Sequence, residues 1–287
     1  MQWAWIDTCC IDKRSSAELS EAINSMYAWY RRSAECVVYL ADVSFDPSSD
    51  DPAALEAALQ QSVWFTRGWT LQELLAPKMK VFCNANWQVL CHVCDDASCH
   101  IPSKSSHDRL RYGFKVPGII SKITGIDESC IIDNNVQFHK RVAKRMSWAS
   151  WRTTTRPEDA AYCLQRIFSV NMTLLYGEGN NAFRRLQEEI IRTSTDESVF
   201  AWLKDDQPVL SGGGGLVASE ISLFEGSDKA EAVREVPRSS DPCSMTNIGV
   251  QMSVQVFDLP KSTDQRLCQR LGLRKPMLES MQITSAW

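Results

Sequence analysis

In the first 90 residues, short apolar runs alternate with segments in which apolar residues recur at helical spacing. The short apolar runs at 3–8 and 37–41 are typical of buried strands, and the alternating pattern at 78–83 predicts a third strand. Apolar residues recur every three or four positions over 16–33, and an Asp-Pro pair begins a second predicted helix over 51–61. The order strand, helix, strand, helix, strand predicts an α/β fold with a parallel sheet.

In the second half of the chain, apolar residues first recur at helical spacing and later alternate with polar residues. The pattern predicts a basic helix over 138–146 and helices that begin near Thr155 and Asn181. The run of four glycines at 212–215 predicts a flexible linker. Clean alternation over 248–256 predicts a strand with one buried face.

The segment WFTRGWTLQELLAP at 64–77 carries the most informative side chains. Trp69 and Glu73 are four positions apart, so a helix would place them on one face. An indole that excludes water from a carboxylate raises its pKa, which is one way to make a general acid or base. The spacing from Thr70 to Glu73 also fits a capping box, in which Glu73 only bonds to a backbone N–H. Spacing alone leaves both interpretations open.

The predicted sheet would gather polar side chains at one edge. Ligands of parallel sheets bind beyond the carboxyl ends of the strands. Asp7 lies at the end of the first predicted strand, so we expect it to lie near the segment from Trp64 to Glu73.

Composition and charge narrow the class of protein. The chain has 287 residues, 44% hydrophobic and 23% charged, which is typical of a globular protein with one domain and a smaller companion. A net charge of −4 without a block of Lys and Arg gives no indication of a nucleic-acid partner. No apolar run approaches the roughly 20 residues of a membrane span, and the start has no signal-peptide pattern. We therefore expect a cytoplasmic protein.

The eleven cysteines are odd in number and irregular in spacing, so we expect free thiols. A Cys-x-x-Cys begins a group of cysteines and histidines that could bind zinc. This group consists of Cys91, His92, Cys94, Cys99, His100 and His107. Its second half lacks the spacing of a zinc ribbon or finger. We expect no metal site and interpret 91–118 as a disordered insertion, with zinc as the alternative.

Two features of the second half are interpreted as structural. Tyr176–Gly179 reads YGEG and lacks the glycines and the lysine of a phosphate loop, so we expect a turn between helices. Charged residues cluster between 152 and 159, and we expect an ion-pair network at the surface or between domains. They are Arg152, Arg156, Glu158 and Asp159.

Two ordered motifs indicate a family. WIDTCCID at 5–12, followed by the 64–77 segment, resembles the fungal heterokaryon-incompatibility (HET) domain. The block at 145–202, with RMSWASWRTTTRPEDAAYCL, LLYGEGNNAFRRLQEEI and DESVFAW, resembles the segment that follows this domain in many fungal incompatibility proteins. SMTNIGVQM, from Ser244, continues the resemblance.

The resemblance implies a domain organisation. Residues 1–90 form a truncated HET domain, 91–118 the insertion, 119–260 a helical region with a few β-strands, and 261–287 a ragged tail. A complete HET domain has an earlier strand and helix. We therefore expect an open sheet edge at 37–41 or 3–6, which is an aggregation hazard.

HET domains look distantly like TIR domains, which are flavodoxin-like modules of cell-death proteins. The TIR pattern Trp-Cys-x-x-Glu-Leu is similar to Trp69–Leu74, and in TIR enzymes this glutamate is essential for cleaving the nicotinamide–ribose bond of NAD. The resemblance implies a TIR-like parallel sheet without its first strand, with Glu73 as catalytic residue. It implies that Asp7, Arg67 and Trp69 bind NAD as a substrate, with no cofactor required.

Three classes of function follow from the resemblance. The first is a cell-death effector of fungal non-self recognition that hydrolyses NAD or a related nucleotide. The second is a non-enzymatic signalling module that assembles with itself or with NLR-type incompatibility proteins. The third is an inactive truncated paralogue.

Overall fold

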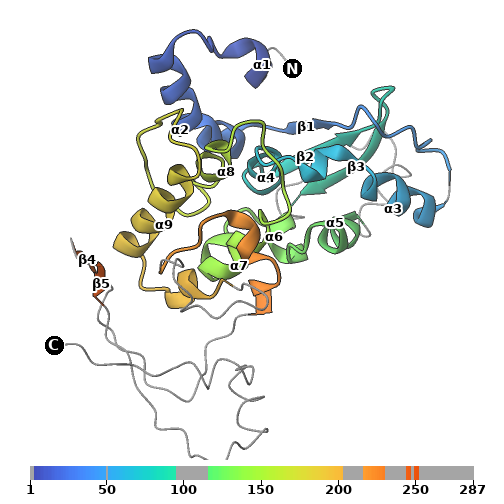
Figure 1. The fold of residues 1–287 in the computed structure, drawn as a ribbon. Coiled ribbons are helices and arrows are strands. Elements are labelled where there is room, and N and C mark those ends of the chain that lie inside the picture. Colours follow the sequence, from blue (N-terminus) through green and yellow to red (C-terminus); the bar gives the residue numbers. More distant parts are fainter. Residues whose placement is uncertain are drawn as a thin grey trace, which may run out of the picture.

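Three strands of the first third of the chain form a mixed sheet in the order β1-β2-β3 (Figure 1). The computed structural model describes residues 3–49, 51–94, 116–202, 216–229, 244–246 and 249–251. Strand β1 (Cys36–Tyr39) is parallel to β2 (Met79–Cys83), and β3 (Val89–Cys94) is antiparallel to β2. The α/β class is confirmed, and the expectation of a wholly parallel sheet is wrong.

The turn between β2 and β3 explains the antiparallel strand. The side-chain oxygen of Asn84 accepts hydrogen bonds from the backbone N–H groups of Asn86 and Gln88, both at 2.9 Å. A turn this short can only return the chain in the antiparallel direction. Strand β3 also contains Cys91 and His92, so the predicted insertion does not begin at residue 91. Residues 95–115 lie outside the described residues.

The first two predicted helices are confirmed, and each begins at the capping residue seen in the sequence. Helix α2 (Ser16–Arg32) begins after Ser15, whose hydroxyl accepts the N–H of Glu18. Helix α3 (Pro52–Gln60) begins after Asp51, whose carboxylate accepts the N–H groups of two residues in the first turn. Such caps satisfy N–H groups that have no partner within the helix.

The predicted strand at 3–8 is wrong. Asp7–Cys10 forms the short helix α1, and Trp3 and Ile6 are 91% and 52% exposed. Within the described residues, β1 has β2 on one side and no strand on the other, so no strand pairs with 3–8. An apolar run without a neighbouring strand has no interstrand hydrogen bonds to keep it extended. The carboxylate of Asp7 is instead favourable at the N-terminus of a helix. The described residues leave one edge of the sheet open at β1, as expected.

Helical segments make up most of the rest of the described chain. The α-helices are α4 (Thr70–Leu75), α5 (Val116–Thr124), α6 (Glu128–Ile132), α7 (Val142–Ser147), α8 (Asp159–Tyr162) and α9 (Asn181–Thr193). The 3-10 helices are η1 (Val63–Thr66), η3 (Val136–His139), η4 (Glu197–Phe200), η5 (Ile221–Phe224) and η6 (Ser227–Lys229). Strands β4 (Ser244–Thr246) and β5 (Gly249–Gln251) form an antiparallel pair. No described helix is both long and apolar enough to span a bilayer.

Predictions for the second half hold for α9 and fail in part elsewhere. Phe183, Leu186 and Ile190 are buried on α9, as expected. The predicted helix at 138–146 is divided, because Asp196 and Ser198 accept the N–H groups of Val142 and Ala143 and start α7 there. The helix predicted from Thr155 is reduced to α8, although the expected inward side chains are buried. These are Ala161, Leu164 and Phe168.

One hydrophobic core extends across both halves of the chain. It joins Leu40 and Phe82 of the sheet region to Trp148, Leu164 and Leu186 of the helical region. Helices α5 and α6 pack beside β3, while α8 and α9 lie on the other side of α4 (Figure 1). The two regions are therefore stabilised together, and their division into domains stays a prediction.

A backbone bridge joins the two halves at Arg67 and Thr153. The N–H of Gly68 donates to the carbonyl of Thr153 at 2.9 Å, and the N–H of Thr153 donates to the carbonyl of Thr66 at 2.7 Å. A Cβ atom at Gly68 would lie 2.5 Å from the Cγ2 methyl of Thr154. Only glycine permits this approach, because real Cβ atoms are not found so close to a neighbouring carbon.

Gly68→Ala is expected to destabilise the protein by about 1–3 kcal/mol, because the added methyl group overpacks the bridge. Adding Thr154→Ser removes the opposing methyl group and should restore most of the loss. Urea unfolding of the two single variants and the double variant measures this coupling. Gly118→Ala is the matched control, since its Cβ would meet the flexible end of Glu128 at 3.2 Å. A double variant as unstable as Gly68→Ala would contradict the steric explanation.

Candidate functional site

The 64–77 segment folds into two short helical pieces, η1 and α4, with a tight connection. The hydroxyl of Thr70 lies 2.7 Å from the carbonyl oxygen of Trp64 and 2.8 Å from that of Arg67, which closes the connection. Helix α4 begins after Trp69 and has no side-chain cap at its N-terminus. Glu73 therefore does not form the capping box that its spacing allowed, and its carboxyl group is available for other contacts.

Glu73 is partly buried, and its carboxyl group is in an unusual electrostatic environment. Removal from water raises its pKa to about 7, and the negative charge of Asp7 contributes in the same direction. Hydrogen bonds from the side chains of Trp64 and Tyr30, together with the positive charge of Arg67, act in the opposite direction. Because desolvation has the largest effect, the group is protonated and ionised in comparable amounts near neutral pH.

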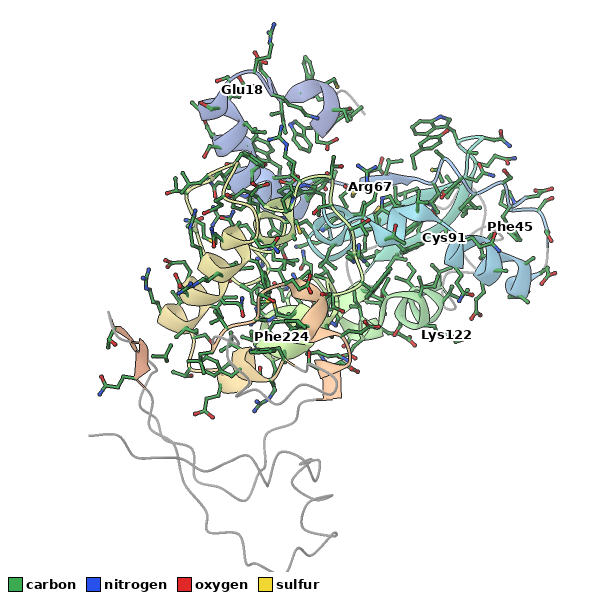
Figure 2. All side chains as sticks on the ribbon, in the orientation of Figure 1. Glu18, Phe45, Arg67, Cys91, Lys122 and Phe224 are labelled. Atoms are coloured by element: carbon green, nitrogen blue, oxygen red, sulfur yellow. The ribbon has the colours of Figure 1, made fainter. Side chains whose placement is uncertain are left out.

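Two of the residues predicted for this site affect the pKa of a third, Glu73. Asp7 and Arg67 both influence the charge of Glu73, although they come from α1 and the η1–α4 connection. The guanidinium group of Arg67 is exposed, and Figure 2 shows it above α4, on the side that carries α1 and α2. Trp69 is placed differently, since its indole bonds to Asp159 and packs in a small cluster with Tyr30.

Two contacts of Glu73 were not identified from the sequence. The indole that donates to Glu73 belongs to Trp64, and the hydroxyl belongs to Tyr30 of α2. Trp64 already stood in the motif. The available signal for Tyr30 was its position as the last apolar residue on the inward face of the predicted 16–33 helix. A polar group at the end of such a face needs a hydrogen-bond partner when it is buried.

Arg152 supports this site from the second half of the chain. Its guanidinium group is buried and donates to the carbonyl of Arg67 at 2.8 Å, the hydroxyl of Thr70 at 3.0 Å and the carbonyl of Trp148 at 3.1 Å. Burial lowers its pKa to about 10, so it remains charged at neutral pH. The expectation of an ion-pair network including Arg152 is wrong, because its guanidinium group donates to carbonyl and hydroxyl oxygens and forms none of the ion pairs among the described residues.

The YGEG segment is a turn between α8 and α9, as expected. The carboxylate of Glu158 accepts the N–H groups of Gly177 at 2.8 Å and Gly179 at 3.0 Å. Hydrogen bonds from the N–H groups of Glu158 itself, Gly179 and Gly177 lower the pKa of this carboxyl group. Glu158 therefore organises the turn, instead of pairing within the predicted charged network.

The predicted Cys/His group lies partly outside the described residues. Cys91, His92 and Cys94 belong to β3, and Cys91 is buried beside Phe82. Cys99, His100 and His107 lie outside the described residues. In the part of the chain that the structure describes, no group of three or more metal-binding side chains is placed to hold an ion.

The arrangement around Glu73 suits acid–base chemistry near neutral pH. A general acid or base is most effective when its pKa lies near the working pH, as the pKa of Glu73 does. The second carboxyl group, Asp7, and the exposed cation, Arg67, give the site groups that can bind hydroxyls and anions. These groups come from separate elements that meet only in the folded chain.

The raised pKa of Glu73 predicts a pH dependence of stability. Its ordinary value is 4.5 and its value in the folded chain is about 7, so the folded state holds a proton that the unfolded state has released between these pH values. The free energy of unfolding should therefore fall as the pH rises through this window, by about 2–3 kcal/mol from this group. Urea unfolding across the window measures the slope.

The control for this measurement is an exposed glutamate of α2. Glu73→Gln should flatten the slope, while Glu21→Gln, at an exposed position of α2, should leave it unchanged. Tyr30→Phe removes a hydrogen bond to the carboxyl group, so it should move the upper end of the window to higher pH. An unchanged slope in Glu73→Gln would show that another group carries the pH dependence.

Comparison with known proteins gives one extended similarity. The chain is 40% identical over 206 residues to vegetative incompatibility protein HET-E-1 of Podospora anserina. The aligned region covers 71% of this chain and 13% of HET-E-1, so the chain spans a small part of that relative. A family described as a domain of unknown function (DUF8212) matches residues 181–213, which include α9. No solved structure gives a significant match.

Proposed function

We propose that this chain is a HET-domain protein that acts in fungal vegetative incompatibility and promotes cell death by hydrolysing NAD. The observation that carries the proposal is Glu73, a carboxyl group with a pKa of about 7 inside the 64–77 motif. The similarity to HET-E-1 supports the role in incompatibility. The TIR-like character of the fold and the reaction rest on the motif around Trp69 and Glu73.

In the proposed reaction, water replaces nicotinamide on the ribose of NAD. The bond between the ribose C1′ and the nicotinamide nitrogen breaks, and its electron pair neutralises the positive pyridinium ring. The ionised carboxylate of Glu73 stabilises the developing oxocarbenium ion. Water then forms the new bond to C1′ and releases a proton, which Glu73 accepts as a general base. The products are nicotinamide, ADP-ribose and one proton.

The neighbouring residues would position the substrate. Arg67 has an exposed guanidinium group, which suits the diphosphate of NAD because its fork of donors matches phosphate oxygens. Asp7 is a carboxylate near Glu73 and can accept ribose hydroxyl groups. Trp69 would add an aromatic wall for the nicotinamide or the ribose. The reaction needs no cofactor.

A second candidate function is signalling by assembly in the cytoplasm, with other copies of the chain or with NLR-type partner proteins. The specific observation is the open edge of the sheet at β1, where Val37 and Tyr39 are 43% and 38% exposed. Trp3 and Ile6 add exposed apolar surface in the N-terminal part. Such surfaces favour association between chains.

The purified chain, incubated with NAD, tests the proposed reaction by release of nicotinamide. Inducible expression in a fungal host, with cell death and the NAD level followed together, tests the biological role. A chimera that adds the HET-E-1 sequence preceding the aligned region provides a second sample. Nicotinamide release and loss of NAD before death would support hydrolysis. Death with NAD intact would favour assembly, and neither effect in either sample would leave an inactive paralogue as the explanation.

A further inference from the structure

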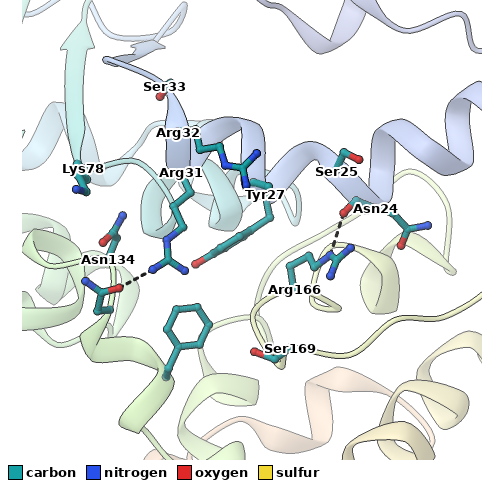
Figure 3. Close-up of a pocket in the computed structure, with 13 residues that line it drawn as sticks. Asn24, Ser25, Tyr27, Arg31, Arg32, Ser33, Lys78, Asn134, Arg166 and Ser169 are labelled. Atoms are coloured by element: carbon teal, nitrogen blue, oxygen red, sulfur yellow. Dashed lines mark hydrogen bonds between the residues drawn. The ribbon is translucent and has the colours of Figure 1, made fainter.

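A basic groove of about 850 Å³ lies beside α2, and Glu73 is not among the residues that line it (Figure 3). Its walls come from α2, the start of η3 and the turn around Ser169. The residues that line it include four cations and no Asp or Glu. The cations are Arg31, Arg32, Lys78 and Arg166. Such a charge pattern raises the local concentration of anions.

Two of the cations are held in place without being neutralised. Arg31 donates to the side-chain oxygen of Asn135 at 2.7 Å, and its guanidinium carbon lies 5.6 Å from the ring centre of Phe138. The Nε of Arg166 donates to the backbone carbonyl of Asn24 at 2.9 Å (Figure 3). These partners carry no charge, so both positive charges remain available to a ligand.

The other two cations have their charges free for a ligand. Arg32 and Lys78 are exposed at the groove. Among the ion pairs of the described residues, none includes any of the four cations. Four uncompensated like charges around one cavity repel one another, and a bound anion relieves that repulsion.

Tyr27 adds a neutral donor at the wall of the groove. Its hydroxyl oxygen accepts a hydrogen bond from the amide of Gln137, so its own hydrogen can be donated to a ligand. Burial raises its pKa to about 12, which keeps the hydroxyl group protonated at neutral pH. Phe138 provides apolar surface next to Arg31. The groove thus combines cations, a neutral donor and an aromatic wall.

We propose that this basic groove binds a phosphorylated small molecule, at a site separate from the one around Glu73. Its volume is within the roughly 300–1,000 Å³ typical of small-molecule sites. Arg32 and Lys78 contact the phosphate groups, Arg31 and Arg166 supply fixed positive charge, and the organic part packs against Phe138. Asp7, Arg67 and Glu73 are not among the lining residues, so the proposal does not depend on the proposed reaction.

Calorimetric titration of the full chain with ADP, inorganic pyrophosphate and adenosine tests this site. ADP and pyrophosphate should bind, and added salt should weaken both. Adenosine should bind at least about tenfold more weakly than ADP, because it lacks the charge that the cations recognise. Absence of binding by both phosphate compounds, or equal affinity for adenosine and ADP, would overturn the proposal.

Variants locate the binding. Arg32→Gln with Lys78→Gln should weaken ADP binding at least about tenfold without changing the melting temperature, since both side chains are exposed. Lys13→Gln with Arg184→Gln removes the same charge outside the groove and should leave the affinity unchanged. Equal weakening in the control pair would contradict this site, and each single groove variant checks the result.

Discussion

Glu73→Gln is expected to abolish nicotinamide release from NAD, with a fall in rate of at least about 100-fold. Glutamine keeps the size of the side chain and can accept hydrogen bonds from Trp64 and Tyr30, but it can neither accept the proton of water nor stabilise positive charge. The same change in cells should prevent both death and loss of NAD. Nicotinamide release, cell survival and melting temperature should be measured on the same variant.

Stability distinguishes a catalytic role from a structural one. Because ionised Glu73 is costly to bury, the glutamine variant should melt at or above the wild-type temperature at neutral pH. Glu21→Gln serves as the control and should keep full activity. Tyr30→Phe should keep the reaction, but activity should begin to rise at a higher pH, because one hydrogen bond to the carboxylate is lost. Full toxicity of Glu73→Gln would exclude the enzymatic proposal and favour assembly.

The parts of the fold that could be predicted depend on residues close together in the sequence. Ser15 and Asp51 satisfy N–H groups within three positions of themselves, so the starts of α2 and α3 could be predicted from local spacing. The buried face of α9 follows from helical spacing alone. These features need no knowledge of the rest of the chain.

The parts that could not be predicted depend on partners far away in the sequence. Residues 3–8 have the apolar pattern of a strand, but no strand in the described chain lies beside them. The start of α7 is fixed by Asp196, more than fifty positions later. The capping pattern at Thr70 is equally misleading, because the Thr70 hydroxyl donates to the nearby carbonyl of Trp64 and accepts a hydrogen bond from Arg152, far along the chain.

The same distinction applies to the candidate site. Glu73, Asp7 and Arg67 stand in motifs, so the resemblance could select them before any geometry was known. Burial has the largest effect on the pKa of Glu73, and Asp7, Trp64 and Tyr30 modify it. Sequence spacing gives no measure of burial. Arg152 looked like a surface charge because arginine is seldom buried. Its role became visible only through the oxygen atoms around it.

Arg152→Gln is expected to destabilise the protein by about 3 kcal/mol, the second large effect. Glutamine cannot supply donors to the carbonyls of Arg67 and Trp148 and to the hydroxyl of Thr70 in the geometry of the guanidinium group. Arg152→Lys should recover only part of the loss, because a single ammonium group cannot match the planar fork. Urea unfolding measures both variants.

The effect of Arg152 should also extend to the charge of Glu73. The positive charge of Arg152 and the negative charge of Glu73 attract each other. Removing the charge of Arg152 should therefore raise the pKa of the Glu73 carboxyl group further. In Arg152→Gln, the pH at which activity rises should therefore move upward together with the loss of stability. Arg184→Gln, in an exposed pair with Glu188, is the control and should cost no more than about 0.5 kcal/mol without moving the pH profile. An Arg152→Gln variant as stable as this control would show that the buried guanidinium group does not hold the connection between η1 and α4.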